Sequence, residues 1–356
     1  MHAVRALIVI AGLLALAGIA TAATPTPTTI EHTPAPVHAL AQDGGLLAWL
    51  TGDGTHCNTI HITGGGNTSI LPQPPSGSMT CHWDLSHGVE ELAIASGASA
   101  ALWTLHERGS DFVMSAQVGG DEVRVDRLAH QTNGRGWWLG GTTGGGTTLA
   151  YSSIDVEYID PLACGSGGSC RKEIAGGEID LVTAGQKTVL PGSGPSLDLA
   201  VSNGRIAYVP ATTVVKGVPA STLSAKVQVV DVSNGSGVSQ ANPVGVPLAV
   251  GLSAHVLAVL SRGTKSLRLT WYDPATGQRL GGISVPALTA PELAVDDQVV
   301  VYRFGRVLRA LVVATRRVRA LGVTAPAHLG LSLDEGRLVW AENGSVSGKI
   351  RALSMP

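Results

Sequence analysis

The stretch "DLAVSNGRIAY", residues 198–208, places two short apolar runs around Ser-Asn-Gly, the pattern of a β-hairpin with a tight turn. The same eleven-residue pattern occurs without a gap at 39–49 as "ALAQDGGLLAW" and at 292–302 as "ELAVDDQVVVY". Each copy has a variable residue, Leu-Ala, five variable residues, two apolar residues and an aromatic residue. A hairpin that recurs in this way indicates a repetitive all-β fold.

Further copies of the hairpin fill the rest of the chain. Three of them carry two additional residues: "ELAIASGASAALW" at 91–103, "PLAVGLSAHVLAV" at 247–259 and "HLGLSLDEGRLVW" at 328–340. An insertion of two residues keeps the same side chains on the buried face of a strand. A seventh, degenerate copy at 138–151, "WLGGTTGGGTTLAY", has Gly and Thr that we expect to widen its turn.

The spacing of the copies predicts the architecture. The leading leucines are Leu40, Leu92, Leu139, Leu199, Leu248, Leu293 and Leu329. Their mean separation is about 48 residues, which is the length of a four-stranded propeller blade. We therefore predict an all-β, seven-bladed β-propeller of four-stranded antiparallel blades. The expected blades are 38–87, 88–133, 134–193, 194–243, 244–288, 289–325 and 326–356.

The last blade lacks one strand in this count. After Trp340 only sixteen residues remain, enough for a third strand, "KIRALSM", but not for a fourth. We expect the Thr/Pro-rich segment 23–37 to supply the outermost strand and to close the ring, which removes exposed strand edges. The alternative is that this segment forms a short extended stalk and leaves the last blade incomplete.

The N-terminus has the layout of a secretory signal peptide. Arg5 precedes an apolar stretch over 6–19, and Ala20-Thr21-Ala22 forms a small-residue cleavage site. We expect cleavage near Ala22 and a mature chain without a membrane span, located in the periplasm or outside the cell. Exported proteins meet oxidising conditions, so Cys57, Cys81, Cys164 and Cys170 are expected to form disulfides. Four cysteines allow three pairings, of which Cys57–Cys81 and Cys164–Cys170 is the simplest.

The charge composition argues against nucleic acid as a partner. Charged residues make up 14% of the chain and the formal net charge is −2, so no basic footprint for nucleic acid is present. The sequons at Asn67, Asn234 and Asn343 matter only if the source glycosylates exported proteins.

The repeats resemble those of TolB-like β-propellers, whose hairpin commonly reads Ser-Pro-Asp-Gly, two variable residues, an apolar residue, Ala and an aromatic residue. The corresponding pieces here are "AQDGGLLAW", "VSNGRIAY" and "LDEGRLVW", without the Pro before the Asp. The resemblance covers residues 38–356. It implies a propeller, and it is compatible with roles that range from interaction scaffold to peptidase-gating domain.

A ring of residues at one channel mouth is the main candidate for ligand binding. In a propeller, the residue before each leading leucine marks the start of the innermost strand. Those residues are Ala39, Glu91, Trp138, Asp198, Pro247, Glu292 and His328. We single out Glu91, Trp138, Asp198, Glu292 and His328, because a narrow mouth lined by such groups focuses the field on a cation or a basic ligand group. The alternative is that they are solvated strand ends. His38, Glu90 and His130 are expected near the same mouth.

No catalytic motif and no metal-binding motif stands out. The cluster of His56, Cys57, His61, Cys81, His82 and His87 contains zinc-binding residue types, but its spacing matches no established zinc motif. His61 alternates with Ile60 and Ile62, which places it on the solvent side of a strand. The Gly-rich stretch 140–146 lacks the Gly-Lys-Ser/Thr ending of a phosphate loop. Asp296-Asp297 and Asp334-Glu335 lie in predicted turns, where acidic residues are common.

We therefore expect a secreted, non-enzymatic propeller that binds a protein or a cell-envelope polymer, without a cofactor, a metal or nucleic acid. One alternative is an extracellular carbohydrate-active hydrolase or lyase with its site at the channel mouth. Another is a metal-binding propeller that uses the acidic ring.

Overall fold

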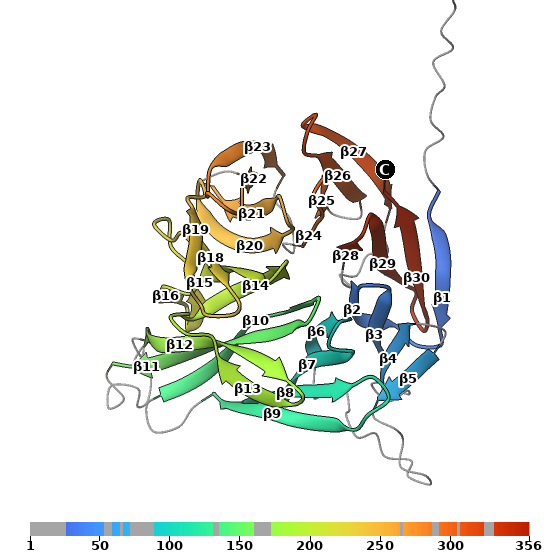
Figure 1. Cartoon of the computed structure of the whole chain (residues 1–356), viewed down its shortest axis with the longest axis horizontal. Helices are drawn as coiled ribbons and strands as arrows, with labels where there is room; N and C mark the ends of the chain where they lie inside the picture. The colour runs from blue at the N-terminus through green and yellow to red at the C-terminus, as the bar shows by residue number, and fades with distance from the viewer. Residues whose placement is uncertain are drawn as a thin grey trace, which may run out of the picture.

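Seven four-stranded antiparallel sheets form a ring in the computed structural model of the 356-residue chain (Figure 1). The structure describes residues 26–52, 59–64, 67–71, 89–107, 109–130, 135–159, 172–263, 266–286, 292–304, 307–323 and 331–355. Within these ranges all thirty elements are strands. The predicted fold class, a seven-bladed β-propeller, is confirmed.

Each blade contains a first, innermost strand followed outward by a second one. The innermost strands are β2 (Val37–Asp43), β6 (Val89–Ala95), β10 (Arg135–Gly145), β14 (Ser196–Ser202), β20 (Val246–Leu252), β24 (Leu293–Val295) and β28 (Leu331–Asp334). The second strands are β3 (Leu46–Thr51), β7 (Ala100–Glu107), β11 (Thr148–Tyr158), β15 (Arg205–Pro210), β21 (Leu257–Arg262), β25 (Val299–Phe304) and β29 (Arg337–Asn343).

Two outer strands complete each blade. The third strands are β4 (Thr59–Gly64), β8 (Ser110–Gln117), β12 (Lys172–Thr183), β18 (Val227–Asp231), β22 (Leu267–Tyr272), β26 (Val307–Val312) and β30 (Gly348–Ser354). The outermost strands are β5 (Asn67–Leu71), β9 (Glu122–Ala129), β13 (Gln186–Val189), β19 (Gly237–Ala241), β23 (Arg279–Val285), β27 (Arg317–Val323) and β1 (Thr28–Thr33). A small hairpin, β16 (Thr213–Val215) and β17 (Val218–Ala220), lies between β15 and β18.

The outermost strand of the last blade comes from the other end of the chain. β1 pairs antiparallel with β30, with Thr28 opposite Ala352 and Thr33 opposite Gly348. In Figure 1, β1 lies at the rim beside β30. The guanidinium of Arg351 donates to Thr29 Oγ1 at 2.6 Å and to the carbonyl of Pro27 at 3.2 Å. The fourth strand that the sequence lacks after Trp340 is therefore supplied by β1, and its contribution to stability is a prediction taken up in the Discussion.

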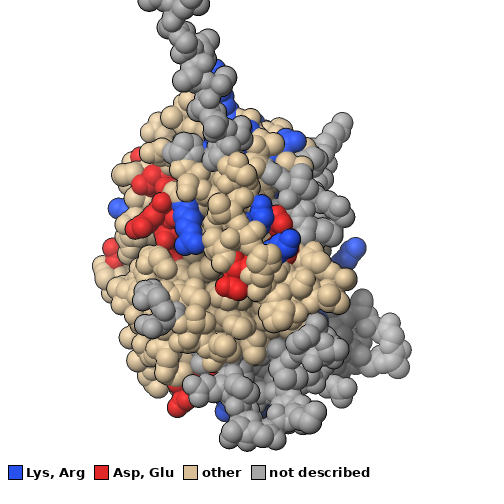
Figure 2. Space-filling model, turned by 90° about the vertical axis from the view of Figure 1, so that its right-hand side faces the viewer, with Lys and Arg blue, Asp and Glu red and all other residues tan. Residues whose placement is uncertain are grey.

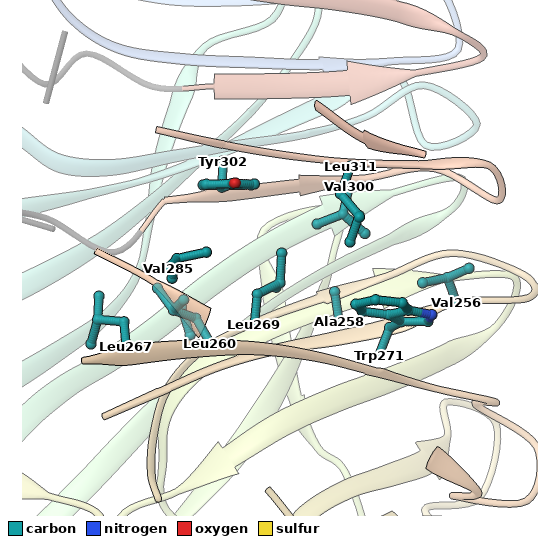
Figure 3. Close-up of a cluster of buried hydrophobic side chains, with 11 residues drawn as sticks. Val256, Ala258, Leu260, Leu267, Leu269, Trp271, Val285, Val300, Tyr302 and Leu311 are labelled. Carbon is teal, nitrogen blue, oxygen red and sulfur yellow. The ribbon is translucent and has the colours of Figure 1, made fainter. Parts of the chain in front are cut away.

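The hydrophobic core lies between the blades, since both faces of a blade pack on its neighbours. Figure 3 shows one example, a cluster of buried hydrophobic side chains between the blade of β20–β23 and the blade of β24–β27. The buried residues that meet there include Leu260, Leu269, Trp271, Val300, Tyr302 and Leu311. Each fully buried Leu, Val or aromatic side chain contributes roughly 1.5–3 kcal/mol to folding. An apolar cluster of this kind occupies every junction between blades.

The observed strand register agrees with the repeat in some blades and differs from it in others. Leu40 lies opposite Trp49 and Leu199 opposite Tyr208, as the ungapped hairpins require. In the last blade Leu331 takes this place opposite Trp340, whereas Leu329 lies outside the described residues. In the third blade Thr142, rather than Leu139, lies opposite Tyr151, because a bulge separates Leu139 from Thr142.

The Gly-rich stretch 140–146 belongs to a strand rather than to a widened turn. Four of its glycines lie in β10, and the turn is confined to Gly146-Thr147. A β-carbon on Gly141 would lie 2.6 Å from Cα of Asp198, and one on Gly144 would lie 2.5 Å from the carbonyl oxygen of Ile94. The neighbouring inner strands approach β10 so closely that only glycine fits.

Candidate functional site

The innermost strands of all seven blades enclose a central cavity of about 650 Å³. Its wall is formed by residues 40–43, 92–94, 142–146, 199–203, 250–254, 293–297 and 331–335. Each of these segments runs toward the turn between the first and second strands of its blade. We call the end of the cavity at these turns the turn end. A cavity of this size is in the range that binds small molecules or the tip of a larger partner.

The turn end carries five carboxyl side chains. They are Asp43, Asp296, Asp297, Asp334 and Glu335. The described residues that line the cavity include no Lys, Arg or His. Carboxylates gathered at a narrow mouth focus a negative potential there, which favours cationic ligand groups.

The carboxylate of Asp43 joins the turns of three blades. Its Oδ2 accepts hydrogen bonds from the backbone N–H of Ser96 at 2.6 Å and of Gly146 at 2.9 Å. Ser96 belongs to the turn of the second blade, and Gly146 to that of the third. The charged acceptor strengthens both bonds, so Asp43 has a structural role as well as an electrostatic one.

Three other carboxylates connect the turns of the fifth, sixth, seventh and first blades in the same way. Asp334 Oδ2 accepts from Gly44 N at 2.8 Å, and Asp296 Oδ2 accepts from Gly336 N at 2.9 Å. Asp297 Oδ1 accepts from His255 N at 2.9 Å. The acidic side chains thus bridge adjacent blades while they line the cavity.

The charge at the turn end is concentrated around Asp334. Burial raises the pKa of the Asp334 carboxyl above its ordinary value. The nearby charges of Asp43, Glu335 and Asp296 raise this pKa further, and the N–H of Gly44 opposes them. A cationic group placed here would relieve the repulsion among the carboxylates.

Four of the five residues predicted from the sequence are described, and they lie toward the opposite end of the inner strands. Glu91, Trp138 and Asp198 lie in β6, β10 and β14, Glu292 directly precedes β24, and His328 is outside the described residues. None of the four described residues lines the central cavity. Their ligand-binding role remains a prediction.

Asp198 lies between the fourth and fifth blades. Its Oδ1 accepts from the N–H of Leu199 at 3.0 Å, and its Oδ2 accepts from the N–H of Val250, in β20, at 2.7 Å. Burial raises the pKa of the Asp198 carboxyl to about 7, although both backbone donors favour the charged form. The side chain therefore joins two blades at a position where ionisation is unfavourable.

Stability is expected to depend on pH through Asp198. Its folded pKa of about 7 exceeds the ordinary 3.8, so between these values the folded chain holds a proton that the unfolded chain has lost. The stabilisation is full below pH 3.8 and is lost as the pH rises through 7, at up to about 1.4 kcal/mol per pH unit. Melting curves from about pH 5 to pH 8 should show a steeper decline for the wild-type chain than for Asp198→Asn. Parallel declines would contradict this assignment.

The two glutamates are engaged within their own blades. Glu292 Oε2 lies 3.6 Å from Arg303 Nη1, and both side chains are 11% exposed. The N–H of Glu91 donates to Thr104 Oγ1 at 3.2 Å, and Oε2 of Glu91 is buried. Among the described residues, no group of three His, Cys, Asp or Glu side chains is arranged to hold a metal ion.

Trp138 lies beside His130. The two rings stack with centroids 5.6 Å apart, and His130 Nε2 lies 2.8 Å from Asp111 Oδ2. Lys172 Nζ lies 5.8 Å from the centroid of the Trp138 ring, within cation–π range. This cluster joins the second and third blades outside the central cavity.

His61 differs from its predicted position on the solvent side of a strand. Its ring stacks on Trp49 with centroids 5.1 Å apart, and its Nε2 hydrogen-bonds Thr51 Oγ1 at 3.2 Å and Thr59 Oγ1 at 3.1 Å. Burial lowers the pKa of His61, against the charge of Glu31. The side chain of His61 does lie on the opposite face of its strand from Ile60 and Ile62. Both faces of a blade, however, pack against neighbouring blades. The other members of the predicted His/Cys cluster, and the predicted disulfides of Cys57, Cys81, Cys164 and Cys170, lie outside the described residues.

The sequence did carry one signal for the acidic turn end. Acidic residues recur at the same turn in the first, sixth and seventh copies, as Asp43, Asp296 and Asp334. In isolation each is an ordinary turn residue. Only the ring brings the three together.

Solved structures of low sequence identity share this fold. A chain of the mitotic checkpoint complex has a TM-score of 0.54 and 14% identity, with 98% of each chain covered. The Dos1 propeller has a TM-score of 0.50 and 10% identity, with 94% of this chain and 95% of that chain covered. The β-propeller domain of the Trilobed protease from Pyrococcus furiosus has a TM-score of 0.51 and 9% identity, with 90% of this chain and 95% of that chain covered.

Neither a known protein family nor a curated protein matches the sequence. The resemblance to TolB-like repeats is therefore not confirmed, whereas the propeller fold is supported by the solved structures. Within the described residues, no helix has the length and apolarity needed to cross a membrane.

Proposed function

We propose that the protein is an exported, non-enzymatic binding scaffold that presents the acidic turn end of its channel to a partner carrying basic groups. The observation that carries this proposal is the set of five carboxylates at the turn end, with no cation among the described lining residues. Export rests on the signal-peptide pattern of residues 1–22.

The hydrogen bonds of the turn end favour binding over catalysis. Asp43, Asp296 and Asp334 each accept a backbone N–H from another blade. A general acid or base must be free to exchange a proton with its substrate, whereas these carboxylate oxygens already hold backbone donors of another blade. A carboxylate in such a bond keeps further acceptor sites for a cationic group.

The negative charge of the turn end distinguishes between the two classes of partner expected from the sequence, a protein and a cell-envelope polymer. A protein surface with exposed Lys or Arg is attracted to the turn end, whereas an anionic envelope polymer is repelled. We therefore favour a protein partner that inserts basic side chains into the channel.

One observation favours a second candidate, an extracellular hydrolase or lyase. His130 and Asp111 form a pair at 2.8 Å beside an aromatic ring, Trp138, that can stack on a sugar. Neither residue of the pair lines the central cavity, so this candidate ranks second.

Binding of a tetralysine peptide to residues 23–356 tests the proposal. Glu335→Gln removes one charge from the turn end without removing a bond between blades, and should weaken binding about threefold. Affinity should also fall as salt rises, because exposed charges are screened. Glu157→Gln, which changes an exposed carboxylate outside the cavity, is the control. No detectable binding, or equal affinities for both variants, would contradict the proposal.

A further inference from the structure

A second pocket lies at the junction of the first and last blades. It has a volume of about 330 Å³ and is lined by β1 and β29 of the last blade and by strands of the first blade. Its polar lining residues include Glu31, Trp49, Thr63, Thr68 and Arg337. We call it the seam pocket. Because Glu31 belongs to the N-terminal strand, the pocket is complete only when β1 is paired with β30.

Trp49 contributes an unsatisfied donor to the wall of this pocket. The residue is 4% exposed, and its indole nitrogen is buried with no acceptor among the described residues. In the last blade, Trp340 holds the equivalent register position and donates its N–H to Glu342 Oε1 at 3.3 Å. An unpaired buried N–H costs about 1–3 kcal/mol. Water does not reach this nitrogen from bulk solvent or from the open pocket, so a ligand meets the Trp49 ring and not its N–H.

Two opposite charges line the pocket without pairing. Arg337 and Glu31 form no ion pair with each other within 4.0 Å, and the Arg337 guanidinium makes no hydrogen bond to any described residue. Glu31 accepts one local bond, from the N–H of His32 at 3.1 Å. A guanidinium is suited to hold a carboxylate with two parallel hydrogen bonds, and a carboxylate is suited to hold an ammonium group.

The outer surface beside this pocket carries charges of both signs. Figure 2 views the rim that contains β1 and β30, where basic and acidic side chains are interspersed among uncharged ones. A ligand with both signs matches the separated charges of the pocket.

We propose that the seam pocket binds a zwitterion, either a free amino acid or a short peptide. The carboxylate of the ligand pairs with Arg337, its ammonium group pairs with Glu31, and the Trp49 ring forms part of the wall. Leu47 and Ile30 offer apolar contact to the rest of the ligand. A volume of about 330 Å³ is at the small end of the range for ligand pockets. This site is separate from the turn end, so the proposed channel function and this inference fail independently.

Thermal-shift and calorimetric titrations of residues 23–356 test this inference. The probes are the free L-amino acids and a set of dipeptides, and a ligand that binds only the folded state raises the melting temperature in a saturable way. For the best ligand, the N-acetyl form and the amide form each lack one charge and should bind at least tenfold more weakly. Tighter binding of the free amino acids than of the dipeptides would identify the ligand as a free amino acid, and the reverse order would identify it as a peptide.

Variants locate the site. Arg337→Gln and Glu31→Gln should each weaken binding at least tenfold, while Lys349→Gln and Glu157→Gln, both at exposed positions outside the pocket, should leave it unchanged. If a pocket variant fails to fold, the N-acetyl and amide analogues test the same contacts on the wild-type chain. No saturable shift with any zwitterion, or equal binding of the blocked analogues or of neutral glucose, would overturn the inference.

Discussion

A chain that begins at residue 38 is expected to melt about 10 °C below a chain that begins at residue 23. Removing residues 23–37 removes β1, its pairing with β30 and the two hydrogen bonds that Arg351 makes to Thr29 and Pro27. It also removes Ile30 and Val37, the first residue of β2, from the apolar cluster at the junction of the first and last blades, and exposes the rest of that cluster. Each kcal/mol lost lowers the melting temperature of a chain of this size by about 1.5 °C, so the expected difference corresponds to roughly 7 kcal/mol.

Two controls isolate the strand from the rest of the segment. A chain that begins at residue 26 keeps β1 whole and should melt like the longer chain. A synthetic peptide of residues 26–37, added to the truncated chain, should restore part of the lost stability in a concentration-dependent way. A difference below about 2 °C between the truncated and longer chains would contradict the idea that this strand holds the ring closed.

Gly140→Ala is expected to destabilise the fold by about 3 kcal/mol or more. A β-carbon on Gly140 would lie 1.9 Å from the carbonyl oxygen of Ser196 and 3.0 Å from Cβ of Ser152. Ser196 is fully buried, and its N–H donates to Ser152 Oγ at 2.9 Å, so the neighbouring strand has little room to move. Overpacking of this kind typically costs about 1–3 kcal/mol, and more where the obstacle is backbone.

Gly176→Ala is the matched control for this substitution. Gly176 also lies in a strand of the third blade, β12, but a β-carbon there meets no atom within 4 Å. Urea unfolding should therefore place the control within about 1 kcal/mol of the wild-type chain. Similar urea midpoints for both variants would contradict this prediction, because they would mean that the third and fourth blades can move apart without loss of stability.

The repeat was readable because hairpins carry their own sequence signal. In "DLAVSNGRIAY", Asn203 has a φ of 49° and Gly204 a φ of 69°, the left-handed conformation that tight turns need. The missing fourth strand could also be inferred, because a count of strands leaves the last blade incomplete. Both inferences need only local patterns and arithmetic.

Register and site geometry were harder to predict, for physical reasons. Bulges in the inner strands, such as the one between Leu139 and Thr142, shift the repeat in ways that periodicity alone does not reveal. Asp198 was expected at a channel mouth, yet its carboxylate bonds the N–H of Val250 in the next blade. Contacts between blades join residues about fifty positions apart, and no linear motif encodes them.

The acidic turn end illustrates the same limit. Asp43 and Asp334 are almost three hundred residues apart, and each is an ordinary turn residue in its own hairpin. They line one cavity only after the ring has formed. A single repeat therefore predicts its own hairpin well and the shared channel poorly.

Hydrogen–deuterium exchange with and without tetralysine peptide tests the central claim most directly, because it reports where a basic ligand binds. The account predicts slower exchange at the inner turns, in segments 40–46, 293–299 and 331–337, and no change in the outermost strands. Protection confined to the outer strands, or exchange that the peptide does not alter, would contradict the assignment of the turn end as the binding surface.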